Sequence, residues 1–86
     1  MYRIAVARGA AKAFRGLHPH VAARLKVAIQ ALAQDPRPPG SLQLSGGQGE
    51  FRIRVGDYRI VYEIHDEEIL VLVLRVAHRR EVYRGR

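Results

Sequence analysis

Several features that would assign a protein to a common class are absent from this sequence of 86 residues. It contains no cysteine, which excludes disulfide frameworks, thiol catalysis and cysteine-bound metal. Its longest unbroken apolar run covers residues 69–74, whereas a helix needs about 20 apolar residues to cross a bilayer. The N-terminus has no apolar stretch followed by a small-residue cleavage site. We therefore expect a cytoplasmic protein rather than a secreted or membrane-bound one.

Acidic residues are also scarce. The chain has 8 Asp and Glu against 15 Lys and Arg, with a formal net charge of +7, and the first acidic residue is Asp35. All but Lys12 and Lys26 of the basic residues are arginines. Arginine binds phosphate through a planar fork and stacks on bases, so the composition favours a polyanionic partner such as nucleic acid. An arginine-rich composition typical of GC-rich genomes is the alternative explanation.

The first half of the chain predicts one strand and two helices. Residues 2–7 alternate loosely, as in a strand, and residues 9–16 place apolar side chains at helical spacing. A second helix begins near Pro19, a favoured residue of the first helical turn. It ends before Asp35-Pro36, because proline disfavours helix at the preceding residue. The short link between the two helices predicts an antiparallel helical hairpin.

The second half predicts three strands. Residues 50–55 and 58–64 alternate between apolar and polar side chains, and residues 69–76 are almost entirely apolar, as in a central strand. We expect the α+β class, with a small, mainly antiparallel sheet, a helical hairpin packed on one face and the other face open. The predicted order is β-α-α-β-β-β, with Tyr58 and Tyr62 on the core side.

Two short motifs are not interpreted as ligand sites. The segment Gly46-Gly47-Gln48-Gly49 lacks the following Lys-Ser/Thr pair and helix of a phosphate loop. His18 and His20 have no carboxylate close by in sequence, so we expect helix capping or exposure rather than a metal pair.

The two-residue turn at residues 56–57 fixes how its flanking strands pair. In that register the apolar residues of both strands share one face, and Arg52, Arg54 and Arg59 crowd together on the other. The predicted pairs are Val55–Tyr58, Arg54–Arg59, Ile53–Ile60 and Arg52–Val61. Directly opposed like charges destabilise a sheet. The carboxylates available to neutralise them are Glu63, diagonal to Arg52, Glu50 near the open end of the hairpin, and Asp57 in the turn. Two interpretations stay open: an anion site, or an ordinary solvated basic face.

From residue 51 onward the sequence resembles a known family. The hairpin FRIRVGDYRIVYEI at residues 51–64, followed by an apolar strand and RVAHRREVY at residues 75–83, is similar to the RelE/ParE superfamily of bacterial toxins. These are the toxin components of type II toxin–antitoxin pairs. The upstream strand, helical hairpin, proline-rich connector and Leu44-Ser45-Gly46 fit as well. The resemblance implies one RelE-like toxin domain over residues 1–86.

The resemblance to RelE-type members implies a ribosome-dependent endoribonuclease that cuts mRNA in the ribosomal A site. In that reaction the ribose 2′-hydroxyl attacks the adjacent phosphate and leaves a 2′,3′-cyclic phosphate and a 5′-hydroxyl. The resemblance implies no metal or other cofactor, and the sequence has no carboxylate cluster of the kind that holds divalent cations.

By position, the resemblance assigns roles to individual residues. Arg59 and Arg79 are expected to hold the phosphorane oxygens, the largest electrostatic contribution to such a step. Arg52 and Arg54 are expected to bind RNA phosphate, and Tyr83 to orient the nucleotide by stacking on a base.

One departure from the family pattern bears on proton transfer. Arg52 and Arg54 stand where the best-known RelE pattern has lysines, and an arginine does not give up its proton. His78 and Tyr83 therefore remain the candidates for general acid–base catalysis, and a histidine has the suitable titration range.

Basic residues of the predicted helices suggest a docking surface. Nonspecific phosphate contacts would let them bind ribosomal RNA, and a solvated helical face explains them equally well. They are Arg8, Lys12, Arg15, Arg24 and Lys26. The resemblance also implies a RelB-like cognate antitoxin, whose acidic or amphipathic segment would cover the basic face or the helical hairpin in a hetero-oligomer.

Two other functions stay open. A ParE-like toxin shares the fold but inhibits DNA gyrase by binding, and a non-catalytic RNA-binding module would need no cleavage chemistry. The combination of Arg54, Arg59, Arg79 and Tyr83 favours the nuclease.

Overall fold

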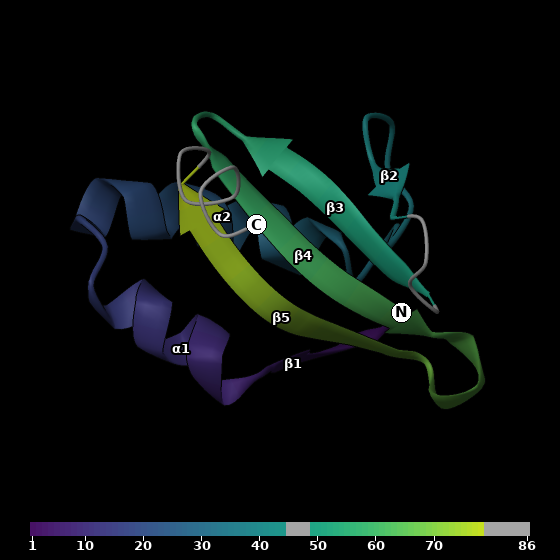
Figure 1. Cartoon of the computed structure of the whole chain (residues 1–86). Coiled ribbons are helices and arrows are strands. Elements are labelled where there is room, and N and C mark those ends of the chain that lie inside the picture. The colour runs from purple at the N-terminus through teal and green to yellow at the C-terminus, as the bar shows by residue number, and fades with distance from the viewer. Residues whose placement is uncertain (45–48, 79–86) are drawn as a thin grey trace.

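The computed structural model of the chain describes residues 1–44 and 49–78. Within these residues, regular structure follows the order of the chain from an N-terminal strand to a long final strand (Figure 1). The elements are β1 (Arg3–Val6), α1 (Arg8–Arg15), α2 (Pro19–Ala31), β2 (Leu42–Gln43), β3 (Glu50–Val55), β4 (Tyr58–His65), the 3-10 helix η1 (Asp66–Glu68) and β5 (Leu70–His78).

The strands form one sheet in the order β1-β5-β4-β3-β2. β1 runs parallel to β5, and the other described pairs are antiparallel. The α+β architecture with a mainly antiparallel sheet is thus confirmed. β2 was not expected from the sequence: it is only two residues long and pairs with the edge of β3 after the proline-rich connector.

The β3–β4 hairpin has the predicted register. Arg54 pairs with Arg59, Ile53 with Ile60, and Arg52 with Val61. Gly56 in the turn has a φ of +61°, a backbone conformation that favours glycine because it has no Cβ. The turn therefore fixes which side chains of both strands share a face.

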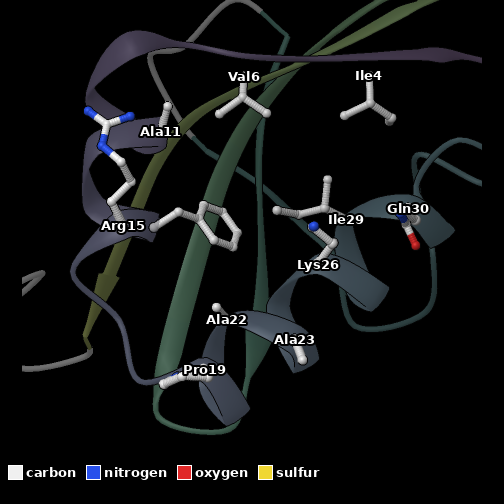
Figure 2. Close-up of a pocket in the computed structure, with 11 residues that line it drawn as sticks. Ile4, Val6, Ala11, Arg15, Pro19, Ala22, Ala23, Lys26, Ile29 and Gln30 are labelled. Carbon is white, nitrogen blue, oxygen red and sulfur yellow. The ribbon is translucent and has the colours of Figure 1, made fainter.

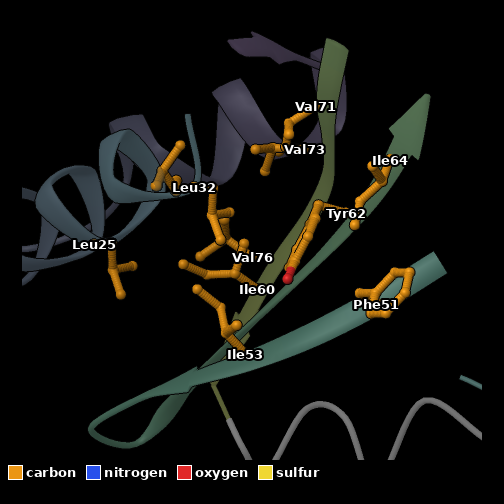
Figure 3. Packing of buried hydrophobic residues seen from close by; sticks show 12 residues of the cluster. Leu25, Leu32, Phe51, Ile53, Ile60, Tyr62, Ile64, Val71, Val73 and Val76 are labelled. Atoms are coloured by element: carbon orange, nitrogen blue, oxygen red, sulfur yellow. The ribbon is translucent and has the colours of Figure 1, made fainter. Parts of the chain in front are cut away.

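The core lies between the sheet and the two helices (Figures 1 and 3). Tyr62 is completely buried at its centre, and Tyr58 packs against its margin, so the core positions predicted for both tyrosines are confirmed. The buried apolar side chains come from alternate positions of β3 and β4, from β5 and from the helices. They include Leu25, Ile29, Leu32, Phe51, Ile53, Ile60, Ile64, Val71, Val73 and Val76.

The start of α2 is capped by a histidine. The backbone N–H of His20 donates to Nδ1 of His18 at 3.1 Å, and the two rings stack with centroids 5.2 Å apart. The capping interpretation of this pair is confirmed. No helix among the described residues is both long enough and apolar enough to span a membrane.

The connector after α2 is tied to the end of β4. Arg37 forms an ion pair with Asp66 at 3.0 Å and lies over the ring of Phe51, and the Tyr2 hydroxyl donates to Asp66 at 2.6 Å. These hydrogen bonds, with that of Arg37 foremost, lower the pKa of Asp66 below its usual value. The cluster closes the end of the sheet opposite the β3–β4 turn.

Candidate nucleic-acid interface

The sheet surface turned away from the helices, called the outer face below, carries the predicted arginine cluster. Arg54 lies directly across from Arg59, and neighbouring strands place such partners about 5 Å apart at Cα. We call this pair the first arginine row. Both side chains are positively charged, and like charges directly opposite each other destabilise a sheet.

Arg59 is far more buried than a solvated basic face would allow. It is 5% exposed, and its neighbour on the same face, Val61, is 7% exposed. The expectation of a fully open outer face is therefore wrong at these positions. Arg54, in contrast, is exposed, so the first row joins one sheltered guanidinium to one that solvent reaches.

Arg75 joins the outer face although the sequence did not single it out as a site residue. The β4–β5 register shifts by one residue, because Val61 pairs with Arg75 whereas the next residue of β4, Tyr62, pairs with Val73. This irregularity skips Leu74 and reverses the alternation of β5, so that Val76 rather than Arg75 enters the core. Bulges of this kind are enriched beside functional sites, where they redirect side chains.

The same shift determines the position of His78. It pairs with Tyr58, which packs against the core, and the two rings meet edge-on with centroids 5.2 Å apart. His78 therefore lies on the helix-facing side of the sheet, whereas Arg54 and Arg59 lie on the outer face. The structure brings the arginines together and does not add His78 to them.

Glu50 and Glu63 do not pair with the first arginine row in any contact seen among the described residues. Oε1 of Glu63 instead accepts a hydrogen bond from Nε2 of His65 at 2.8 Å. Glu50 lies directly across from Glu63. These two acidic side chains thus lie together at one end of the outer face, beyond Arg52.

Three further predictions fall wholly or mainly outside the described residues. Arg79 and Tyr83 follow the end of β5, and most of the glycine-rich segment around Gly46 lies in the gap at residues 45–48. Their sequence-based roles stay predictions.

The basic residues proposed for docking lie on the two helices and are all exposed: Arg8, Lys12, Arg15, Arg24 and Lys26. Arg24 differs from the others because its guanidinium lies beside Gly56, where a Cβ would be 3.3 Å from Nη2. It thus packs on the turn that carries the first arginine row. The others present positive charge on the helical side of the molecule.

An apolar groove of about 750 Å³ runs between α1, α2 and β1 (Figure 2). Ile4, Val6 and Ile29 point into it, and Arg15 and Lys26 stand at its margin. Val6 is 43% exposed, so part of this apolar lining faces solvent. An amphipathic segment with acidic residues matches both the lining and the basic margin.

Comparison with sequence families gives one match over nearly the whole chain. The model of a family described as "ParE toxin of type II toxin-antitoxin system, parDE" matches residues 4–83. Toxin RelG of Mycobacterium tuberculosis is 38% identical over 64 residues, which cover 74% of this chain and 74% of RelG.

Solved structures of RelE toxins share the fold. The intact E. coli RelBE toxin–antitoxin complex matches with a TM-score of 0.81 and 28% identity, covering 91% of this chain and 96% of the matched chain. The isolated E. coli RelE toxin matches with a TM-score of 0.81 and 29% identity, covering 99% and 94%. The RelBE2 toxin–antitoxin complex of Mycobacterium tuberculosis has a TM-score of 0.80 and 29% identity, covering 90% and 96%.

Proposed function

We propose an activity for this chain on the premise that it belongs to the RelE/ParE superfamily, the toxins of type II toxin–antitoxin systems. The proposed activity is that of a ribosome-dependent endoribonuclease, which cleaves mRNA in the ribosomal A site and so stops translation. The observation that carries the proposal is the opposed pair Arg54 and Arg59 on the outer face, with Arg59 sheltered from solvent.

The proposed chemistry needs concentrated positive charge. The 2′-oxygen forms a bond to phosphorus while the bond from phosphorus to the 5′-oxygen breaks, and the proton of the 2′-hydroxyl leaves as the 5′-oxygen gains one. Negative charge builds on the non-bridging oxygens between these events. Fixed donors such as the guanidinium groups of Arg54 and Arg59 stabilise that charge, and loss of one such donor typically costs 10²–10³-fold in rate.

Proton transfer requires a group other than these arginines, since a guanidinium keeps its proton. His78 and Tyr83 are the two candidates from the sequence. The contact of His78 with Tyr58 on the helix-facing side favours Tyr83 for contact with the nucleotide, and both roles stay predictions.

An antitoxin is the expected protein partner, since the matched structures include toxin–antitoxin complexes. We assign its acidic amphipathic segment to the groove between α1, α2 and β1, whose margin carries Arg15 and Lys26. Val6→Asp would put a carboxylate into this lining. It should weaken capture of the cognate antitoxin at least tenfold while the rate of mRNA cleavage stays unchanged. Unchanged capture would refute the assignment of the groove.

The test of the activity is cell-free translation with the purified chain. Messages truncated within the A-site codon, with a 2′,3′-cyclic phosphate at the new end, are expected for the unaltered protein and should be lost with Arg54→Ala. Intact messages with active translation would contradict the proposal.

A second candidate function is inhibition of DNA gyrase, because the matching family model is that of ParE toxins. A supercoiling assay in the same preparation separates the two functions. Inhibited supercoiling with intact messages would assign the chain to this second function.

A further inference from the structure

The register shift between β4 and β5 builds a second pair of arginines on the outer face. Arg52 and Arg75 both lie beside Val61, one on each neighbouring strand. The three residues form what we call the second arginine row. With strands about 4.8 Å apart, the two Cα atoms are separated by about 10 Å, which lets two long side chains converge above the valine between them.

Arg52 and Arg75 can both donate further hydrogen bonds to an anion. The Nε of Arg52 is buried and has no hydrogen-bond partner among the described residues, and Arg75 is exposed. Val61 between them offers no polar group. A buried guanidinium nitrogen without a partner is costly, and an oxyanion supplies the acceptor that the site lacks.

Among residues 1–44 and 49–78, the carboxylates near this row do not supply that acceptor. Glu63 is the acidic residue diagonal to both arginines across β4, and its carboxylate lies 2.8 Å from Nε2 of His65. Glu50 lies next to Glu63, in the direction away from the first arginine row. The first and second arginine rows are thus positively charged. The next row along the sheet, called the third row, contains Glu50 and Glu63 and is negatively charged.

We propose that Arg52 and Arg75 together bind one phosphate of single-stranded RNA, adjacent in the strand to the phosphate held by Arg54 and Arg59. Same-face residues two positions apart along a strand are about 7 Å apart, which is close to the separation of successive phosphates in an extended single strand. The proposal rests on the proposed function only in taking RNA as the ligand. The carboxylates of the third row repel phosphate, so the bound RNA strand contacts these two rows alone.

The test measures binding without cleavage. The full-length chain is titrated into a short fluorescent single-stranded RNA with 2′-O-methyl groups, which cannot attack the phosphate, and the affinity is measured over a range of salt concentrations. Each phosphate contact contributes about 0.7 to the slope of log affinity against log salt for a single strand. Arg75→Gln and Arg52→Gln should each lower the slope by about 0.7. The double variant should also lose about 0.7 rather than twice that amount, because the one phosphate is bound only while both side chains hold it.

Two further variants keep the result interpretable. Arg75→Lys retains the charge but not the fork, so its slope should stay unchanged while its affinity falls several-fold. Arg3→Gln is the matched control: Arg3 is exposed and pairs with Leu70 beyond the acidic side chains, so its slope and affinity should equal those of the unaltered chain.

Failure of the shared phosphate site and failure of the proposed nuclease activity would give different results. An unchanged slope with Arg75→Gln, or a double variant that loses twice the single loss, would overturn the shared phosphate site. Binding with the expected slopes but without cleavage on ribosomes would refute the proposed nuclease and leave this site standing.

Discussion

The two faces of the β3–β4–β5 sheet are built from alternate residues of the same strands, yet they have opposite properties. On the helix-facing side Ile53, Ile60 and Tyr62 form a closed apolar core. One residue away along the chain, Arg52, Arg54 and Arg59 form the outer face. Stability and the proposed anion binding therefore depend on separate side chains of one scaffold. Substitutions on one face should leave the property of the other face largely intact.

The largest effect that would test this separation is expected at Arg59. Arg59→Met keeps a long apolar stem at a position that is 5% exposed but removes the donors. We expect cleavage of ribosome-bound mRNA to fall by about 10²–10³-fold, with the midpoint of thermal unfolding close to that of the unaltered chain. A variant that unfolds at room temperature would show that Arg59 serves the fold instead. Retained cleavage would remove it from the site.

Ile60, the next residue in the chain, tests the other face, where a substitution should lower stability and leave cleavage unchanged. Ile60 is completely buried on the helix-facing side, so Ile60→Ala should lower the free energy of unfolding by about 2–5 kcal/mol. Val61→Ala, on the outer face, should cost clearly less, because alanine removes fewer carbon atoms there. Denaturant unfolding measures both values. At a temperature where Ile60→Ala is still folded, its cleavage rate per folded molecule should be unchanged, and a large loss of rate would break the separation of the faces.

Most of this arrangement could be predicted from local sequence patterns. Period-two alternation on both sides of Gly56-Asp57 was sufficient for the strand pairing and for the positions of Arg54 and Arg59. The two-residue strand at Leu42–Gln43 could not be predicted, because two residues show no alternation. The burial of Arg59 could not be predicted either, since it depends on tertiary surroundings rather than on the pattern of its own strand.

The register shift between β4 and β5 explains why Arg75 and His78 do not lie on the faces that simple alternation along β5 would give them. In an uninterrupted strand that continues from the buried Val71 and Val73, Arg75 would face the core and His78 would share the face of the arginines. The skipped residue, Leu74, reverses both assignments. The apolar run at residues 69–74 hides this change, because apolar side chains stand on both faces and leave no mark of where the alternation switches. The single sequence hint is the charge of Arg75 between Val73 and Val76.

A moderate effect is expected at the turn that sets both faces. Gly56→Ala forces a side chain into a left-handed conformation and brings its Cβ to 3.3 Å from the guanidinium of Arg24. The expected loss in free energy of unfolding is about 1–2 kcal/mol. Gly9→Ala is the matched control: Gly9 lies in α1 with open space around it, and alanine there should be neutral or stabilising by up to about 1 kcal/mol. Equal losses at both glycines would mean that the turn conformation is not required.

The smallest effect is expected at the end of the sheet farthest from the β3–β4 turn. The pKa of Asp66 is lowered chiefly by the hydrogen bond from Arg37, and by that from Tyr2. A carboxyl group whose pKa is lower in the folded than in the unfolded chain stabilises the fold fully above the unfolded value of about 4. This contribution disappears as the pH falls through the lowered folded value. Asp66→Asn should therefore reduce Tm by at most a few degrees at pH 7, since the ion pair is exposed.

The pH dependence of that small effect separates the ion pair from packing. As the pH falls through the lowered pKa of Asp66, the unaltered chain and Asp66→Asn should come to melt at nearly the same temperature, because protonation removes the charge that the substitution removes. Added salt at pH 7 should narrow the difference in the same way. A difference in Tm that does not shrink as the pH is lowered would assign the loss to packing around Phe51. The outer face should bind RNA equally in both proteins at pH 7, because Asp66 lies on the far side of Glu50 and Glu63 from the arginines proposed to bind phosphate.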